Sequence, residues 1–143
     1  GWSYHYCRRQ WSLVDNPNLK YCWLNDFDKA MIKTIKSEKN FNKTPVQEIW
    51  HNDGDQVLAY MRGDLLFVFN FSPTRSFTDY GFLVPTGAYS IVLDTDNKEF
   101  GGNGLNDDSM THLTTYDPLY VGDRKEWLKL YLPARSALVL KKN

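Results

Sequence analysis

Residues 64–71 read DLLFVFNF and residues 88–94 read AYSIVLD, and these two runs decide the fold. Both are rich in β-branched and aromatic residues, which favour strands. Turn chemistry bounds each run: Ser72-Pro73 follows the first, Pro85-Thr86-Gly87 precedes the second, and Asp94-Thr95-Asp96-Asn97 follows it. The pattern predicts two strands at the centre of a β-rich unit.

Shorter runs of the same kind surround this centre. Further strands are predicted at residues 46–52, 56–62, 127–133 and 136–142, with a weaker one around residues 113–116. A tight turn at Gly63 joins two of the runs into a hairpin, and three glycines within residues 99–108 predict an irregular loop. No helical period follows residue 45. The sequence therefore predicts a mainly β fold, an antiparallel Greek-key β-sandwich.

One amphipathic helix is predicted before the strands. Asn16 is placed to cap it and Pro17 to occupy its first position. Apolar residues then recur every four positions on one face, flanked by Cys22 and Ala30; this stripe consists of Leu19, Trp23, Phe27, Met31 and Ile35. We expect a helix over residues 17–37. The polar stretch that follows ends at Pro45, so the sequence predicts two units, residues 1–44 and residues 45–143.

Composition excludes several classes of partner. The chain of 143 residues carries 17 basic and 17 acidic side chains, so it has no net field to attract nucleic acid. It contains no apolar run long enough to span a membrane, and its first residues lack the build of a signal peptide. We therefore expect a cytoplasmic protein. Cys7 and Cys22 lack metal-ligand spacing and are expected to be small buried apolar residues.

The residues that could carry catalysis or bind a metal do not form a recognisable pattern. His5, His51 and His112 lie in three separate segments, and none accompanies a nucleophile motif. Asp94, Asp96 and Glu99 space their oxygens somewhat like a calcium loop, but the central glycine and the distal bidentate glutamate of such a loop are missing. A turn capped by aspartate side chains is the favoured interpretation. The sequence predicts no catalytic residue, no metal and no cofactor.

Aromatic side chains offer the one candidate for ligand binding. The chain has five Trp, nine Tyr and eight Phe, and such side chains either fill a β core or stack on sugar rings. Trp2, Trp50 and Trp127 are the candidate sugar-binding residues, with core packing as the alternative for each. Two glycosylation sequons begin at Asn42 and Asn70, and we interpret both as chance matches.

Several tracts, taken together and in order, resemble one enzyme family. They are SYHYCRRQWSLVD, LNDFDKAM, LLFVFNFSP with FTDY, PTGAYSIVLDTDNKEFGG and LPARSALVL. In this order they resemble the carboxy-terminal part of 1,4-α-glucan (glycogen or starch) branching enzymes, which belong to the α-amylase superfamily. The resemblance spans practically the whole chain. Many relatives carry an arginine after the Asp-Tyr that matches Asp79-Tyr80, whereas this chain has Gly81.

This resemblance implies both an architecture and a role. Residues 1–44 would be the last loop and final helix of a catalytic (β/α)8 barrel, and residues 45–143 the all-β carboxy-terminal domain that packs on it. The family's catalytic carboxylates lie on earlier barrel strands, and no matching motif occurs here. A complete enzyme would form α-1,6 branches in glucan by glycosyl transfer with retention. The chain alone is expected to be inactive, with α-glucan and the barrel as its partners.

The sequence supports two further hypotheses. The rival to a branching-enzyme fragment is a freestanding carbohydrate-binding β-sandwich module with an exposed aromatic platform. If the helix stripe evolved to face a barrel, it should also leave apolar surface exposed around Trp23, Phe27 and Met31. We then expect the isolated chain to dimerise through this stripe, unless the helix folds back over its own β-domain.

Overall fold

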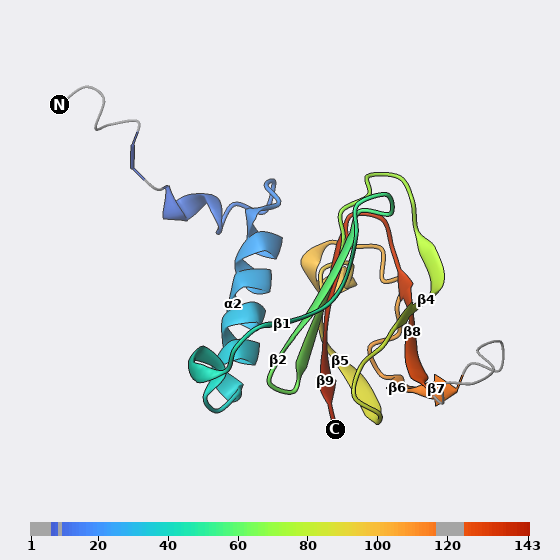
Figure 1. Ribbon diagram of the computed structural model, residues 1–143. Helices are drawn as coiled ribbons and strands as arrows, with labels where there is room; N and C mark the ends of the chain where they lie inside the picture. The colour runs from blue at the N-terminus through green and yellow to red at the C-terminus, as the bar shows by residue number, and fades with distance from the viewer. Residues whose placement is uncertain (1–6, 9, 117–124) are drawn as a thin grey trace.

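The computed structural model describes residues 7, 8, 10–116 and 125–143, and within them one α-helix precedes two antiparallel sheets (Figure 1). The helical segments are α2 (Tyr21–Ser37) and the short 3-10 turns η1 (Trp11–Leu13), η2 (Phe41–Lys43) and η3 (Lys98–Phe100). The strands are β1 (Gln47–Asn52), β2 (Val57–Arg62), β3 (Leu65–Asn70), β4 (Phe77–Phe82), β5 (Ala88–Asp94), β6 (Thr111–Leu113), β7 (Thr115–Tyr116), β8 (Glu126–Leu132) and β9 (Ser136–Lys142).

The two sheets differ in size and neither follows the order of the chain. In the described residues, the larger sheet has the strand order β1-β2-β3-β9-β5-β6 and the smaller one the order β4-β8-β7. The last strand, β9, lies between β3 and β5 and pairs antiparallel with both. Residues 64–71 and 88–94, whose pattern decides the fold, therefore flank β9 in the middle of the larger sheet.

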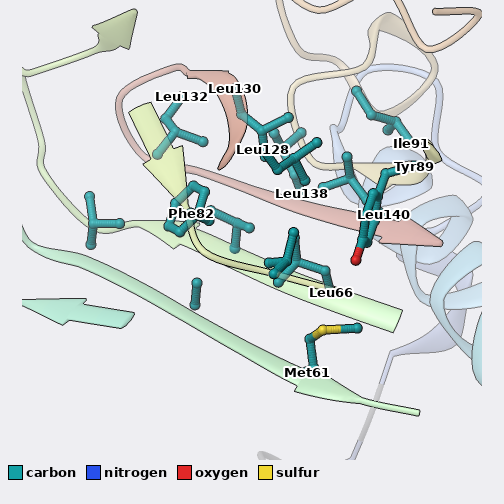
Figure 2. Close-up of a cluster of buried hydrophobic side chains, with 14 residues drawn as sticks. Met61, Leu66, Phe82, Tyr89, Ile91, Leu128, Leu130, Leu132, Leu138 and Leu140 are labelled. Atoms are coloured by element: carbon teal, nitrogen blue, oxygen red, sulfur yellow. The ribbon is translucent and has the colours of Figure 1, made fainter. Parts of the chain in front are cut away.

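The main core lies between the two sheets. Figure 2 shows leucines of β8 and Phe82 of β4 facing residues of β2, β3, β5 and β9. The alternation along β8 places Leu128, Leu130 and Leu132 inward, each almost completely buried. Burying one such side chain contributes roughly 1.5–3 kcal/mol before the entropy cost of ordering the chain. The predicted mainly β, antiparallel sandwich is thus confirmed.

Helix α2 packs on the opposite face of the larger sheet, away from β4 and β8 (Figure 1). A second apolar cluster holds it there, in which Phe27 and Ala30 contact the buried Leu65, Leu93 and Val139. The ring of Phe27 meets that of Phe100 edge-on at 5.3 Å between centroids. The helix therefore folds back over its own β-domain.

The structure corrects the predicted helix start and one strand. The helix begins at Tyr21 rather than residue 17, because the Asn16 side chain accepts a hydrogen bond from the Asn18 amide and Pro17 lies in a preceding turn. Strand β4 was not predicted, since Asp79 sits there at φ 51° in a bulge that interrupts the alternation. The weak strand predicted around residues 113–116 is two short strands in different sheets.

One expectation about exposure is also wrong, and a second is confirmed only in part. Cys7 is exposed rather than buried, while Cys22 is half-buried, and both are free. Phe27 is packed rather than exposed, so the stripe that was expected to form one open surface is divided. Trp23 and Met31 at its edge remain partly exposed. Of the described residues, none belongs to a helix that could span a lipid bilayer.

Candidate functional site

A groove opens between the edge of the larger sheet and the smaller sheet, with a volume of about 640 Å³. Strand β1 is the edge strand and contributes Trp50; strand β8 contributes Trp127 from the other sheet. The rest of the groove lining comes from β1, from the turn between β1 and β2, and from β4 with the residue that follows it; these residues are Ile49, Asn52, Asp55, Phe77, Thr78, Asp79, Tyr80, Gly81, Phe82 and Leu83. The groove is thus the place where distant segments converge.

The structure brings together two of the three predicted glucan-binding residues. Trp50 is 45% exposed at the edge of the larger sheet; the register of β1 shifts between Glu48 and Trp50, so Ile49 packs against the main core while Trp50 pairs with Ala59. Trp127 is half-buried against β4, where a Cβ on Gly81 would lie 3.5 Å from the Trp127 ring. Trp2 lies outside the described residues. Two indoles lining one groove form an arrangement that can stack on flat apolar faces of sugar rings.

A bulge in β4 shapes the groove floor. Phe77 is paired with Leu132 and Tyr80 with Leu130, so three steps along β4 match two along β8. The extra residue lets Phe77 and Tyr80 lie on the same side, with their rings in edge-on contact at 5.2 Å between centroids. Tyr80 therefore enters the groove, although strict alternation would have placed it on the opposite face from Phe77.

Polar groups are fixed in the groove by hydrogen bonds. Trp50 Nε1 donates to the Tyr80 hydroxyl at 3.1 Å, and that hydroxyl donates to Asp55 Oδ2 at 3.0 Å. Arg75 Nη2 donates to Asp55 Oδ1 at 2.6 Å. Burial, opposed by the Trp50 hydrogen bond and assisted by Asp55, raises the pKa of Tyr80 above its ordinary value. The sequence alone assigns no site role to Asp55 or Tyr80.

The histidines that the structure describes lie outside the groove lining. His51 is exposed on β1 and its Nδ1 is 2.7 Å from Glu48 Oε1, a contact that raises the pKa of His51. His112 on β6 is half-buried, and burial lowers its pKa. His5 lies outside the described residues. His51 is therefore an exposed histidine held by a hydrogen bond to Glu48.

The loop that resembled a calcium site is a capped turn, as expected. Asp94 Oδ1 accepts from the Asp96 amide at 2.7 Å, and the Asp96 carboxylate accepts from the amides of Asn103 and Leu105, both at 3.0 Å. Asn97 Oδ1 caps η3 by accepting from the Glu99 amide. Across the described ranges, no group of three His, Cys, Asp or Glu side chains is arranged to hold a metal ion.

Comparison with known proteins matches residues 49–143 to the family described as "Alpha amylase, C-terminal all-beta domain". The chain is also similar to the 1,4-alpha-glucan-branching enzymes of Candida glabrata, at 44% identity, Yarrowia lipolytica, at 43%, and Saccharomyces cerevisiae, at 42%. These matches cover 96%, 97% and 98% of this chain and 19%, 20% and 20% of the respective relatives. The chain thus spans about a fifth of the length of these curated relatives.

Proposed function

Because the chain belongs to the family of alpha-amylase C-terminal all-beta domains, we propose that it is the carboxy-terminal part of a 1,4-α-glucan branching enzyme. The observation that carries the proposal is the extent of the match to branching enzymes, which takes in α2 as well as the sandwich. In the proposed complete enzyme, catalysis belongs to another part of the polypeptide. This chain supplies a structural domain and no catalytic residue.

We further propose that residues 1–44 belong with a catalytic barrel and residues 45–143 form the terminal domain. Support comes from the face of α2 that points away from the sheet, where Tyr21, Leu24 and Ile32 are exposed. The same side of the larger sheet carries a row of stacked aromatic rings, made by Tyr60, Phe67, Phe69 and Phe71. A catalytic barrel covering both surfaces would remove this apolar area from water.

A branching assay tests the structural role. A protein that carries this chain behind its catalytic barrel should introduce α-1,6 linkages into amylose, measured from the anomeric proton signals, whereas the 143-residue chain alone should not. Turnover by the chain alone would contradict the proposal. The upstream coding sequence separates the proposal from its rival: a barrel-coding region supports a branching enzyme, and its absence would favour a freestanding carbohydrate-binding module.

The groove supports a second role, the guiding of α-glucan chains along the domain surface. Trp50 and Trp127 line it from two different sheets, and together with the polar groups between them they offer stacking and hydrogen bonding to one sugar chain. We expect maltoheptaose to bind the 143-residue chain in calorimetry. Trp50→Ala and Trp127→Ala should each weaken binding about tenfold, because each loses one stacking surface. Trp11→Ala, which changes an exposed tryptophan outside the groove, is the matched control.

In the absence of a barrel, we propose that two copies of the chain associate through the outward face of α2. Leu24 and Ile32 are exposed on that face, about two helical turns apart. Sedimentation should then show a dimer whose dissociation constant rises on Leu24→Glu. A strictly monomeric profile at high concentration would contradict this association.

We also propose a cytoplasmic location. Two features support it: Cys7 and Cys22 are both free thiols, as is usual in a reducing compartment, and Asn70, the acceptor of one sequon, is 2% exposed and hydrogen-bonded. Cell fractionation with antibody detection should find the protein in the soluble cytosol, without a glycan on Asn42. Recovery of a glycosylated form from the culture medium would contradict this location.

A further inference from the structure

The three polar groups on the groove wall form a hydrogen-bond chain with a fixed direction. The Trp50 indole N–H can only donate, and it lies 3.1 Å from the Tyr80 oxygen, so that oxygen must accept. The Tyr80 hydroxyl proton is then available to Asp55 Oδ2, which lies 3.0 Å away. An ionised carboxylate only accepts. The chain can therefore run in one direction, from Trp50 through Tyr80 to Asp55.

The far end of this chain is anchored to the backbone. Arg75 Nη2 bonds both Asp55 Oδ1, at 2.6 Å, and the Gly54 carbonyl, at 3.1 Å. The Arg75 guanidinium also lies over the Phe77 ring, 5.1 Å from its centroid. Asn52 Oδ1 accepts from the Asp55 amide at 2.9 Å and holds the turn from the other side. Asp55 is thus an oriented acceptor on a braced turn.

Tyr80 itself is held by its neighbours in β4. Its ring contacts those of Phe77 and Phe82, at 5.2 and 5.3 Å between centroids. Burial raises its pKa, so the hydroxyl keeps its proton and its donor role at neutral pH. Trp50, by contrast, is an exposed side chain on an edge strand, and a hydrogen bond to Tyr80 fixes its indole across the groove.

We propose that Tyr80 is the positioning residue of the groove, and that its hydroxyl, oriented by Asp55, holds the Trp50 indole as a pre-formed wall for an α-1,4-linked glucan chain. This inference rests on the proposed glucan-guiding role. A tryptophan fixed before binding loses less conformational entropy when the sugar arrives, so a single hydroxyl can raise affinity without touching the ligand. Tyr80 acts through Trp50.

The test measures the hydrogen exchange of the Trp50 indole and the binding of maltoheptaose separately in the 143-residue chain. The indole N–H resonance of Trp50 is assigned by its loss in Trp50→Phe, and its exchange with water is followed in the wild type and in Tyr80→Phe. We expect exchange about fivefold faster in Tyr80→Phe and maltoheptaose binding about fivefold weaker, as the loss of one hydrogen bond allows. Asp55→Ala should likewise speed the exchange of the Trp50 indole and weaken maltoheptaose binding. Tyr21→Phe, which removes a hydroxyl on α2, should change neither the exchange rate nor the binding.

The outcomes separate the two proposals. An unchanged Trp50 resonance and exchange rate in Tyr80→Phe would overturn the positioning role, whether or not maltoheptaose binds. If the resonance responds but the wild-type chain binds no maltoheptaose, the positioning of Trp50 by Tyr80 stands and the glucan-guiding role is lost. Equal binding by the wild type and by Tyr80→Phe, with a mobile Trp50, would overturn the claim that the fixed wall serves the ligand.

Discussion

The ring of Trp23 lies directly on Gly101, so closely that a Cβ at that position would come within 2.2 Å of Trp23 Cε3. Gly101 also has φ +78°, a conformation that other residues adopt only with strain. The contact joins helix α2 to the loop after β5. The tract LDTDNKEFGG therefore provides the surface on which the amino-terminal half of α2 rests.

Gly101→Ala should destabilise the chain by at least about 2–3 kcal/mol, because it adds a clash with Trp23 to the backbone strain. Chemical denaturation followed by circular dichroism measures the free energy of unfolding. Gly63→Ala is the matched control: Gly63 has φ +63°, but the nearest atom to its added Cβ is 4.0 Å away. Gly63→Ala should therefore lower the free energy of unfolding by the backbone strain alone, about 1–2 kcal/mol. Equal losses in the two variants would show that the Trp23 contact contributes nothing.

Asn70→Ala should cost about 2–4 kcal/mol, since buried partners would lose their hydrogen bonds. The Asn70 amide nitrogen bonds the carbonyl oxygens of Arg75, Leu132 and Pro133 at 2.9, 3.2 and 3.0 Å. Its oxygen accepts from the Ser72 amide. One side chain thus ties the turn after β3 to the turn between β8 and β9. Thermal unfolding checks this loss, and Asn42→Ala, at an exposed asparagine, should change stability by less than about 0.5 kcal/mol.

Phe27→Ala should cost about 1.5–3 kcal/mol, because Phe27 packs on Phe100 and the second apolar cluster. Leu24→Ala, on the exposed face of the same helix, should change stability by less than about 0.5 kcal/mol. Both are measured by urea denaturation at low protein concentration. The reverse ranking would mean that α2 docks on the sheet through its other face.

The stability of the chain should decrease with pH where Asp94 ionises. Asp94 is 2% exposed, and burial is the main cause that raises its pKa above 3.8. The folded state then holds this proton more tightly than the unfolded chain does, so the Asp94 contribution is greatest below pH 3.8. It falls as pH rises through the raised pKa and then becomes constant. The difference in unfolding free energy between the wild type and Asp94→Asn should fall over that window.

Asp107 provides a control of opposite sign. Hydrogen bonds from Ser109 lower the pKa of Asp107, so its contribution is present at neutral pH and is lost as pH falls through the lowered value. The difference in unfolding free energy between the wild type and Asp107→Asn should therefore rise with pH. If the free-energy differences of both variants changed with pH in the same direction, burial would not be what sets the pKa of Asp94.

Gly81→Arg should weaken maltoheptaose binding about tenfold, measured by calorimetry. A Cβ at Gly81 would lie in ordinary contact with the Trp127 ring, 3.5 Å from Cε3, so a longer side chain must extend over that ring or into the groove. Gly81→Ala should bind as the wild type does. Unchanged binding in Gly81→Arg would show that the glucan passes elsewhere.

Sequence reasoning succeeded where one pattern governs a whole segment. It gave the bounds of β5 and β9 correctly, since both are uninterrupted apolar runs between clear turns. It missed β4, because its FTDYGF sequence contains Asp79 at positive φ and a glycine within a strand. It placed the helix start too early, because the capping side chain of Asn16 serves a turn of its own.

The candidate site was less predictable than the fold. Trp50 and Trp127 could be chosen as aromatic residues able to stack, but their convergence depends on how two sheets pack. Tyr80 owes its place to a one-residue shift of pairing, and Asp55 owes its role to Tyr80. Such relationships join residues far apart in the chain, and local propensity carries no information about them.

The bulge at Asp79 decides which face of the sheet the later residues of β4 occupy, and the composition of the strand does not reveal this. If β4 kept all its residues but paired with β8 without the bulge, strict alternation would carry Tyr80 to the opposite face of the sheet. The groove would then lose the hydroxyl that meets Trp50, although every residue named in it would still be present in the chain. The bulge thus sets the phase of the strand. Deleting its extra residue would keep Tyr80 on the groove side, whereas straightening the bulge with that residue in place would separate the site from its own residues.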